Sequence, residues 1–344
     1  MQPSIAIRPS SCRSMWGRIA MLCVLLFAFG AAYAQKLPRL VLAGPMASVS
    51  NPLIHMAESG ALADIADQVE FQLWRDPDQL RVMALDGKAD VLAMPVNVAA
   101  NLYNRGAKLR LLNVSTWGVL WMVSREEGLK TLADFRGKEI AMPFRGDMPD
   151  IIFNLLAEGQ GIDVRKEIKL RYVATPVDAM QLLVMRRVDH ALLAEPAVSM
   201  ALRKTHSFPL SAIAPELYRS VDLQQEWGRV FKREARIPQA GIALMASVKD
   251  RPDIVARIEA EYARSLEWCK ANAARCGELV AEHVDMLTPE AVADSVAVGQ
   301  MQAVSARAAR TEVEFLYEHL RRKTPALIGG KLPPDDFYGG SAQQ

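Results

Sequence analysis

The sequence lacks the motifs that identify many enzymes. It contains no G-x-S-x-G motif, no phosphate-binding Gly-Lys-Ser/Thr sequence and no dinucleotide fingerprint. Its five histidines, at positions 55, 190, 206, 283 and 319, have no spacing typical of a metal site. These absences argue against the common hydrolase, nucleotide-dependent and zinc-enzyme classes. They predict a protein without catalytic residues, metal or cofactor.

An excess of charge of one sign is also missing. The 344 residues include 41 basic and 39 acidic ones, with no basic run, which argues against nucleic acid or an anionic membrane surface as a partner. Beyond the N-terminal region, no segment reaches the roughly 18 consecutive apolar residues of a membrane-spanning helix. We therefore expect the mature protein to be soluble.

The N-terminus has the three parts of an export signal. Three arginines precede an apolar run at 19–32, which ends in Ala32-Tyr33-Ala34, the small-x-small pattern that a signal peptidase cleaves. We predict a signal peptide at 1–34 and a periplasmic mature chain, with an uncleaved membrane anchor as the alternative. Removing the three arginines leaves 38 basic residues against 39 acidic ones, a net charge of −1.

Cysteine is rare, and two of the four cysteines leave with the predicted signal. The remaining pair, Cys269 and Cys276, is a disulfide candidate in an oxidising compartment. On one continuous helix the two would lie roughly 10 Å apart, beyond bonding reach. A bridge therefore requires the helix to end near Asn272-Ala273, and two separate buried thiols are the alternative.

From Leu40 onward, short apolar runs alternate with helical patterns. The strands predicted are 40–43, 69–74, 89–94, 109–114, 121–124, 138–142, 168–173, 189–194 and 237–246. The helices predicted are 52–58, 78–86, 98–104, 149–158, 177–187, 196–204, 254–271, 278–283, 289–298 and 303–321. This order predicts an α/β fold of mostly parallel sheets with helices on both faces, in two lobes because about 310 residues exceed one core. Residues 205–236 have no clear pattern, and the tail from Gly329 is expected to be loop.

Ligands of open α/β sheets bind beyond the carboxyl ends of strands, near helix N-termini. The loops in such positions are 44–51, 94–97, 116–118, 143–149 and 195–196. From these loops and the end of the second strand we select ten candidate ligand-binding residues: Met46, Ser48, Asn51, Trp74, Met94, Asn97, Trp117, Arg145, Asp147 and Glu195.

Several candidates have a structural interpretation beside the functional one. Arg145, beside a helix N-terminus, would clamp a sulfonate or carboxylate, or it is an ordinary surface arginine. Trp74 and Trp117 would stack on a ligand ring, or they fill the core. The methionines at 46, 94, 142 and 148 would form an adaptable apolar wall that favours an organic ligand, or they are core filling.

Three stretches match a known pattern in order. They are GKADV at 87–91, TLADFRGKEIAMP at 131–143 and RVDHALLAEP at 187–196. Together they resemble the nitrate/sulfonate/taurine class of ABC-transporter solute-binding proteins, which includes receptors related to thiamine-pyrimidine-synthesis proteins. The resemblance spans roughly 40–202. Arg187 and His190 replace the family's usual Gly and Ala, and the loop after the first strand lacks its aromatic residue, so no ligand is carried over.

The resemblance implies a type II periplasmic-binding-protein fold, with two βα lobes, a hinge and a helical C-terminal segment. Lobe I would comprise 36–118 plus 238–328, lobe II 119–237, and the C-terminal tail 329–344. It implies a receptor, which we expect to be a monomer, that closes on a small molecule and then docks on an ABC permease and ATPase. The helix N-termini, Arg145 and the methionines of the listed loops predict that this molecule is organic and has an anionic or polar head. The alternatives are an enzyme of this fold acting on a carboxylated or pyrimidine-type metabolite, and a sensor module that presents its ligand to a membrane receptor.

Overall fold

The computed structural model describes residues 36–207 and 216–340. The predicted signal peptide at 1–34 lies outside the described residues, as do Cys12, Cys23 and residues 341–344 of the predicted tail. Within the described ranges, no helix has the length and apolar character needed to cross a membrane.

The first sheet has seven strands in the order β12-β5-β11-β3-β1-β2, with β4 paired to β11. The strands are β1 (Leu40–Gly44), β2 (Val69–Leu73), β3 (Val91–Pro95), β4 (Leu109–Leu111), β5 (Asn113–Gly118), β11 (Ala240–Met245) and β12 (Gln300–Ser305). β1 pairs in parallel with β2 and β3, and every other pair in this sheet is antiparallel.

The second sheet has five strands in the order β10-β6-β9-β7-β8. They are β6 (Leu120–Ser124), β7 (Glu139–Pro143), β8 (Lys169–Val173), β9 (His190–Ala194) and β10 (Tyr218–Asp222). β7 pairs in parallel with β8 and β9, whereas β6 pairs antiparallel with β9 and β10. Both sheets are mixed, so the prediction of mostly parallel sheets was wrong. Parallel pairing requires a helical crossover between the two strands. The chain passes between the sheets at β5, β6 and β11 without such a crossover, so these strands pair antiparallel with their neighbours.

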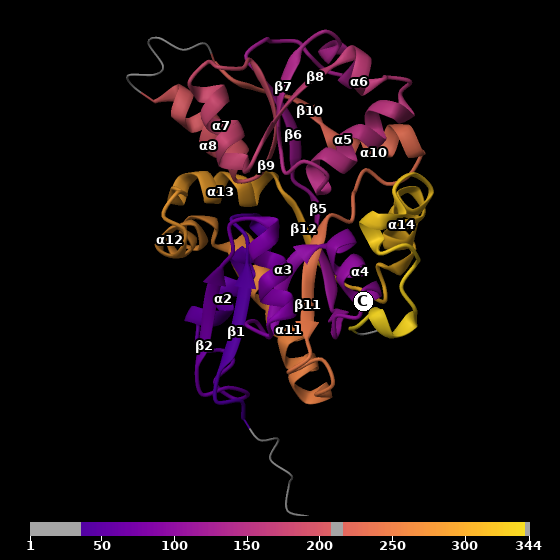
Figure 1. Ribbon diagram of the computed structural model, residues 1–344. Coiled ribbons are helices and arrows are strands. Elements are labelled where there is room, and N and C mark those ends of the chain that lie inside the picture. Colours follow the sequence, from indigo (N-terminus) through magenta and orange to yellow (C-terminus); the bar gives the residue numbers. More distant parts are fainter. Residues whose placement is uncertain (1–35, 208–215, 341–344) are drawn as a thin grey trace, which may run out of the picture. The chain divides into compact units, whose positions relative to one another are not determined.

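Helices cover both faces of the second sheet (Figure 1). α7 (Pro176–Val184) and α8 (Ala197–His206) pack on one face, and α5 (Met148–Gly159) and α10 (Leu223–Phe231) pack on the other. The short helices η2 (Leu132–Phe135) and α6 (Val164–Glu167) precede β7 and β8. We call this sheet with its helices the second lobe.

The strands of the first sheet alternate between two apolar layers. Leu40 and Leu42 of β1 pack with α2 (Asn51–Glu58) and α11 (Pro252–Ala271), while Val41 and Ala43 belong to the cluster on the other face. The remaining helices are η1 (Ser48–Ser50), α3 (Pro77–Leu85), α4 (Val96–Asn104), α12 (Ala273–His283), α13 (Pro289–Val298), α14 (Arg310–Lys323), η3 (Pro325–Ile328) and η4 (Asp335–Phe337). We call this sheet with these helices the first lobe.

Two regions differ most from the elements predicted. Part of 205–236 is regular, because it contains β10 and α10. The helix predicted at 303–321 is in fact strand β12 followed by α14. β12 lies at the edge of its sheet and exposes Gln300 and Gln302 on either side of buried Met301, so its apolar content is too low to indicate a strand.

Two crossing segments, 116–119 and 236–239, connect the lobes. They are hydrogen-bonded to each other, since Ile237 N donates to Trp117 O at 2.7 Å and Gln239 N donates to Thr116 O at 3.0 Å. Just beyond them, a Cβ on Gly241 would lie 1.9 Å from Asn113 O. Only glycine therefore lets β11 approach β5 this closely.

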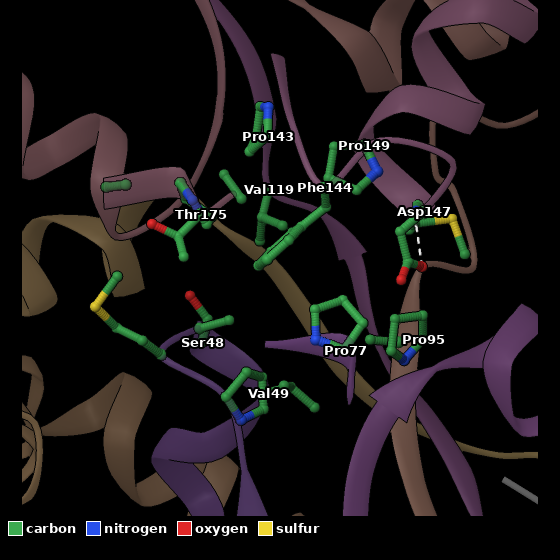
Figure 2. Close-up of a pocket in the computed structure, with 18 of the residues that line it drawn as sticks. Ser48, Val49, Pro77, Pro95, Val119, Pro143, Phe144, Asp147, Pro149 and Thr175 are labelled. Atoms are coloured by element: carbon green, nitrogen blue, oxygen red, sulfur yellow. Dashed lines mark hydrogen bonds between the residues drawn. The ribbon is translucent and has the colours of Figure 1, made fainter. Parts of the chain in front are cut away.

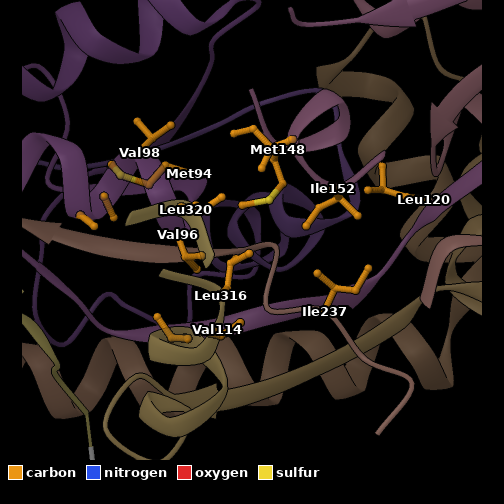
Figure 3. Close-up of a cluster of buried hydrophobic side chains, with 14 of the residues drawn as sticks. Met94, Val96, Val98, Val114, Leu120, Met148, Ile152, Ile237, Leu316 and Leu320 are labelled. Atoms are coloured by element: carbon orange, nitrogen blue, oxygen red, sulfur yellow. The ribbon is translucent and has the colours of Figure 1, made fainter. Parts of the chain in front are cut away.

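Apolar packing is continuous between the lobes beside the crossing segments. Met94 and Val96 of the first lobe, Met148 and Ile152 of the second, and Leu316 of α14 belong to one buried cluster (Figure 3). This shared core holds the lobes together at the crossing side.

Cys269 and Cys276 form a disulfide with a Cα–Cα distance of 5.1 Å. α11 ends at Ala271 and α12 begins at Ala273, so the break in the helix lies where the bridge was predicted to need it. The disulfide is thus confirmed. It fixes the corner from which α12 and α13 extend toward the second lobe.

Candidate functional site

A cavity of about 400 Å³ lies between the two lobes. The first lobe lines it with the loops that follow β1, β2 and β3, and the second lobe with the loops that follow β7, β8 and β9. Figure 2 shows Ser48, Pro77 and Pro95 on one side and Phe144 and Asp147 on the other. These loops lie at the carboxyl ends of strands, where open α/β sheets bind ligands, and the volume suits a small organic molecule.

Most of the cavity lining is apolar. Six prolines contribute to it, namely Pro45, Pro77, Pro95, Pro143, Pro149 and Pro176. Proline fixes the backbone of each loop, so these walls are pre-formed. Four methionines, Met46, Met94, Met148 and Met286, add polarisable side chains that adapt to the shape of a ligand. This lining suits a ligand with an apolar body.

Three polar side chains in the lining have buried atoms without a hydrogen-bond partner among the described residues. The atoms are Ser48 Oγ, Thr116 Oγ1 and both amide atoms of Gln239, and the three residues are at most 4% exposed. An unpaired buried polar group costs about 1–3 kcal/mol. A ligand with matching donors and acceptors would recover that energy, and so would ordered water. Buried atoms of Asn97, Asn104 and Asn113, outside the cavity lining, also lack a partner among the described residues, so it is the grouping of these atoms in one cavity that makes them candidate ligand contacts.

Two of the three carboxylates that line the cavity are already bonded within the protein. Glu195, only 1% exposed, accepts a hydrogen bond from Ser199 Oγ at 2.8 Å and forms an ion pair with Arg219 at 2.7 Å. Asp178 accepts bonds from Thr175 N and Oγ1 at 2.9 and 2.8 Å, which closes the capping box of α7. Both carboxylates therefore have structural roles.

Asp147 is the third carboxylate, and its environment is different. Its carboxylate accepts a bond from Met148 N at 2.9 Å and forms no ion pair with the described residues. Burial raises the pKa of Asp147, although the Met148 N–H and the charge of Arg81 act in the opposite direction. Arg75 also lines the cavity, but it is exposed.

Phe144 has a left-handed backbone with φ of +54°, which is rare for a bulky residue. Its ring is half-buried and enters the cavity from the second lobe (Figure 2). Strained backbone persists where the surrounding structure imposes it, and it often marks functional sites. Phe144 is therefore a candidate contact for the flat face of a ligand.

The structure brings six of the ten candidates from the sequence to this cavity: Met46, Ser48, Trp74, Met94, Asp147 and Glu195. Of these, Trp74 is held by a bond from its Nε1 to Ala93 O at 3.1 Å. Met142, another of the strand-end methionines, is buried in the core and does not line the cavity.

The other four candidates lie elsewhere. Trp117 is buried under the guanidinium of Arg236, 4.0 Å above its ring. Asn51 and Asn97 are buried in the first turns of α2 and α4. Arg145 lines a separate hollow, with its guanidinium 4.9 Å from the centre of the Tyr172 ring. Arg145, the predicted anion clamp, therefore does not line the cavity.

Sequence reasoning missed Thr116, Phe144, Gln239 and Met286 as individual contacts. Two of them follow from positions that the sequence did indicate, because Thr116 precedes Trp117 and Phe144 lies in the 143–149 loop. No pattern in the sequence indicated Gln239 or Met286 as ligand contacts. They reach the cavity from the second crossing segment and from the α12–α13 loop, which do not follow the strands used to select candidates. In the described ranges, no three histidine, cysteine or acidic side chains are arranged to hold a metal ion.

No family model matches the sequence, and no curated protein is significantly similar to it. Solved structures are similar. An ABC transporter protein from Parabacteroides distasonis has a TM-score of 0.70 and 20% identity, with 88% of this chain and 98% of that chain covered. The chain has the periplasmic-binding-protein fold.

Two further structures with this fold have named ligands. The periplasmic aliphatic sulphonate binding protein from Escherichia coli has a TM-score of 0.63 and 14% identity, over 88% of this chain and 99% of that one. The periplasmic nitrate-binding protein from Synechocystis PCC 6803 has a TM-score of 0.65 and 13% identity, and the match covers 85% of this chain and 84% of that chain. The resemblance predicted from the sequence is thus confirmed at the level of the fold.

Proposed function

We propose that this protein is the extracytoplasmic solute-binding component of an ABC importer. It captures a small organic solute with a polar head and an apolar body in the cavity between its lobes. The observation that carries this proposal is the set of unpartnered polar atoms on Ser48, Thr116 and Gln239 inside a largely apolar cavity. Buried polar groups are normally completed by a protein group, an ordered water or a ligand, and these atoms lie together in the lining of one cavity.

The crossing segments give the cavity a means to close. Thr116 and Gln239 lie on the two segments, whose backbones are bonded by Gln239 N to Thr116 O. A solute bonded to both side chains contacts the axis about which the lobes turn. Closure then follows because the solute adds contacts from the second lobe only when the lobes approach each other.

The lobe boundaries in this proposal are 36–118 plus 238–328 for lobe I and 119–237 for lobe II, with the tail at 329–344. Export through the signal at 1–34 would place the protein in the periplasm as a monomer, and its partners would be an ABC permease and ATPase. The fold and the export signal of the sequence support these assignments.

The head of the solute is polar in this proposal rather than specifically anionic. The support for an anionic head was Arg145, and that residue lies outside the cavity. The cation that does line the cavity is Arg75, which is exposed to solvent, where a charge pair contributes little.

Native mass spectrometry of protein purified without unfolding tests this function. We expect a mass excess equal to one small organic molecule. Thr116→Val should lower the occupied fraction, because it removes a polar group that only the solute completes. Thr205→Val is the matched control, since Thr205 is equally buried but its Oγ1 bonds Leu202 O at 3.0 Å outside the cavity. Equal occupancy in both variants, or no bound molecule in any sample, would contradict the proposal.

A further inference from the structure

Asp147 does not cap its helix in the way that Asp76 and Asp222 cap theirs. Asp76 accepts bonds from the second and third residues of α3, and Asp222 does the same at α10. Asp147 instead bonds only the first residue of α5, Met148. The second residue, Pro149, has no N–H to donate. Capping therefore uses one oxygen of Asp147 and leaves the other directed elsewhere.

The remaining oxygen of Asp147 belongs to the cavity. The residue is 8% exposed and lines the cavity wall opposite Pro77 and Pro95 (Figure 2). Asp147 forms no ion pair among the described residues, although the charge of Arg81 acts on it from a distance. Arg81 pairs with Asp78 at 3.2 Å, and Arg75 is exposed at the edge of the cavity. A carboxylate that is buried without a counter-ion is costly, so a cationic partner would be strongly favoured at this position.

Other features of the cavity fit the same ligand. Phe144, whose carbonyl accepts the Asp147 N–H at 2.9 Å, places an aromatic ring in the same loop and the same cavity. An aromatic face attracts a cation and stacks on a flat body. The unpartnered atoms of Ser48, Thr116 and Gln239 are uncharged, so they match neutral donors and acceptors rather than a second charge.

We propose that the solute has a cationic nitrogen head, an ammonium or amidinium group, which binds the carboxylate of Asp147 against the ring of Phe144. The apolar body of the solute lies along the proline and methionine walls, and its neutral polar groups reach Ser48, Thr116 and Gln239. This inference rests on the proposed function and specifies the class of solute for the same cavity.

Three probes of matched shape and different charge test the inference. Benzylamine is a cation at neutral pH, benzyl alcohol is neutral and benzoate is an anion, and each is small enough for the cavity. Isothermal titration at millimolar probe concentration should show binding in the order benzylamine, benzyl alcohol, benzoate. In Asp147→Asn, affinity for benzylamine should fall about tenfold or more, while affinity for benzyl alcohol should be unchanged.

Asparagine caps helices as well as aspartate, so Asp147→Asn should fold. Asp222→Asn is the matched control, because Asp222 is also a helix cap whose pKa burial raises, but it does not line the cavity. It should leave the order and the affinities unchanged.

The possible failures separate the two proposals. Preferential binding of benzoate or benzyl alcohol, or an unchanged benzylamine affinity in Asp147→Asn, would overturn the cationic head while leaving a solute-binding cavity. Binding of none of the three probes, together with native mass spectra that show no bound molecule, would overturn the solute-binding function as well.

Discussion

Arg203 on α8 and Asp294 on α13 form a two-point ion pair in which Arg203 Nη2 lies 2.8 Å from Asp294 Oδ1 and Nε reaches Oδ2. The pair joins the second lobe to the helical segment that the disulfide fixes on the first lobe. Met286, in the loop before α13, lines the cavity. In the proposed mechanism, the ion pair lies on the side where the lobes separate to admit a solute.

Arg203→Gln should release this contact and weaken solute binding. Both side chains are more than 40% exposed, so we expect a loss of less than about 1 kcal/mol, a few-fold in affinity. The solute should dissociate faster, which stopped-flow displacement of the co-purified molecule would measure. Arg321→Gln is the control, because Arg321 forms a similar pair with Glu318 within α14. Equal dissociation rates in the two variants would show that the pair does not hold the lobes together.

The contribution of this pair should also depend on pH. The hydrogen bond from Arg203 lowers the pKa of Asp294 below its ordinary value. The stabilisation that the ion pair contributes is therefore complete above about pH 4. It is lost as the pH falls through the lowered pKa of Asp294. The difference in dissociation rate between wild type and Arg203→Gln should shrink in acid, and a difference that grows in acid would contradict this assignment.

Asp147→Asn should stabilise the solute-free protein at neutral pH. Because burial raises the pKa of Asp147 in the folded state, its contribution to stability decreases as the pH rises from about 4 through the raised pKa. Replacing the charged carboxylate should add on the order of 1 kcal/mol to the free energy of unfolding at pH 7 and nothing at pH 4. Thermal unfolding at the two pH values would measure the difference. A stability loss at pH 7 would show that the carboxylate is needed for the fold.

Phe144→Asn separates ligand contact from backbone strain. Asparagine tolerates the left-handed region, so the free energy of unfolding should remain within about 1 kcal/mol of wild type. Affinity for benzylamine should nevertheless fall, because the ring is lost. Lys232→Asn, at another left-handed position on the C-terminus of α10, should change neither quantity appreciably. Unchanged affinity in Phe144→Asn would exclude the ring as a contact.

Gln239→Met and Gln224→Met should affect the free energy of unfolding differently. Both glutamines are buried, but Gln224 bonds the backbone of Leu120 and Asp222 Oδ1, whereas both amide atoms of Gln239 have no partner among the described residues. Gln224→Met should lower the free energy of unfolding by about 1–3 kcal/mol, while Gln239→Met should leave it unchanged or raise it. Gln239→Met should also weaken solute binding. Chemical denaturation and titration with the co-purified solute would measure both. Similar stability losses would show that Gln239 is a structural residue.

The disulfide should stabilise the fold by about 2–3 kcal/mol, because it closes a short loop in the unfolded chain. Replacing Cys269 and Cys276 together by serine should lower the unfolding free energy by that amount in denaturant titrations. Two thiols that react in the unreduced, unfolded wild type would contradict the bridge.

Much of the fold was predictable because its apolar runs are short, regular and bounded by turns. β1 and β3 are apolar along nearly their whole length, and the start of α7 carries a complete capping box from Thr175 to Asp178. β10 escaped prediction because it is an edge strand in which Val221 is the buried residue. The antiparallel pairing of β11 depends on the return of the chain from the second lobe, which local sequence does not encode.

The candidate site was predictable as a set of loops rather than as a set of side chains. Loops after strands were correctly expected to meet, since parallel strands end at the same edge of a sheet. Arg145 lines a separate hollow, between Phe144 and Gly146, whose left-handed backbones form a turn that no propensity of the sequence indicates. Gln239 was not selected because an unpartnered amide becomes visible only when its three-dimensional neighbours are known.

A crystal structure of the protein purified without unfolding tests the central claim most directly. We expect electron density for one organic molecule between the lobes, hydrogen-bonded to Ser48, Thr116 or Gln239 and with a nitrogen within bonding distance of the Asp147 carboxylate. Density for water alone in crystals of protein whose native mass spectrum shows a bound molecule would place the solute elsewhere and contradict the account.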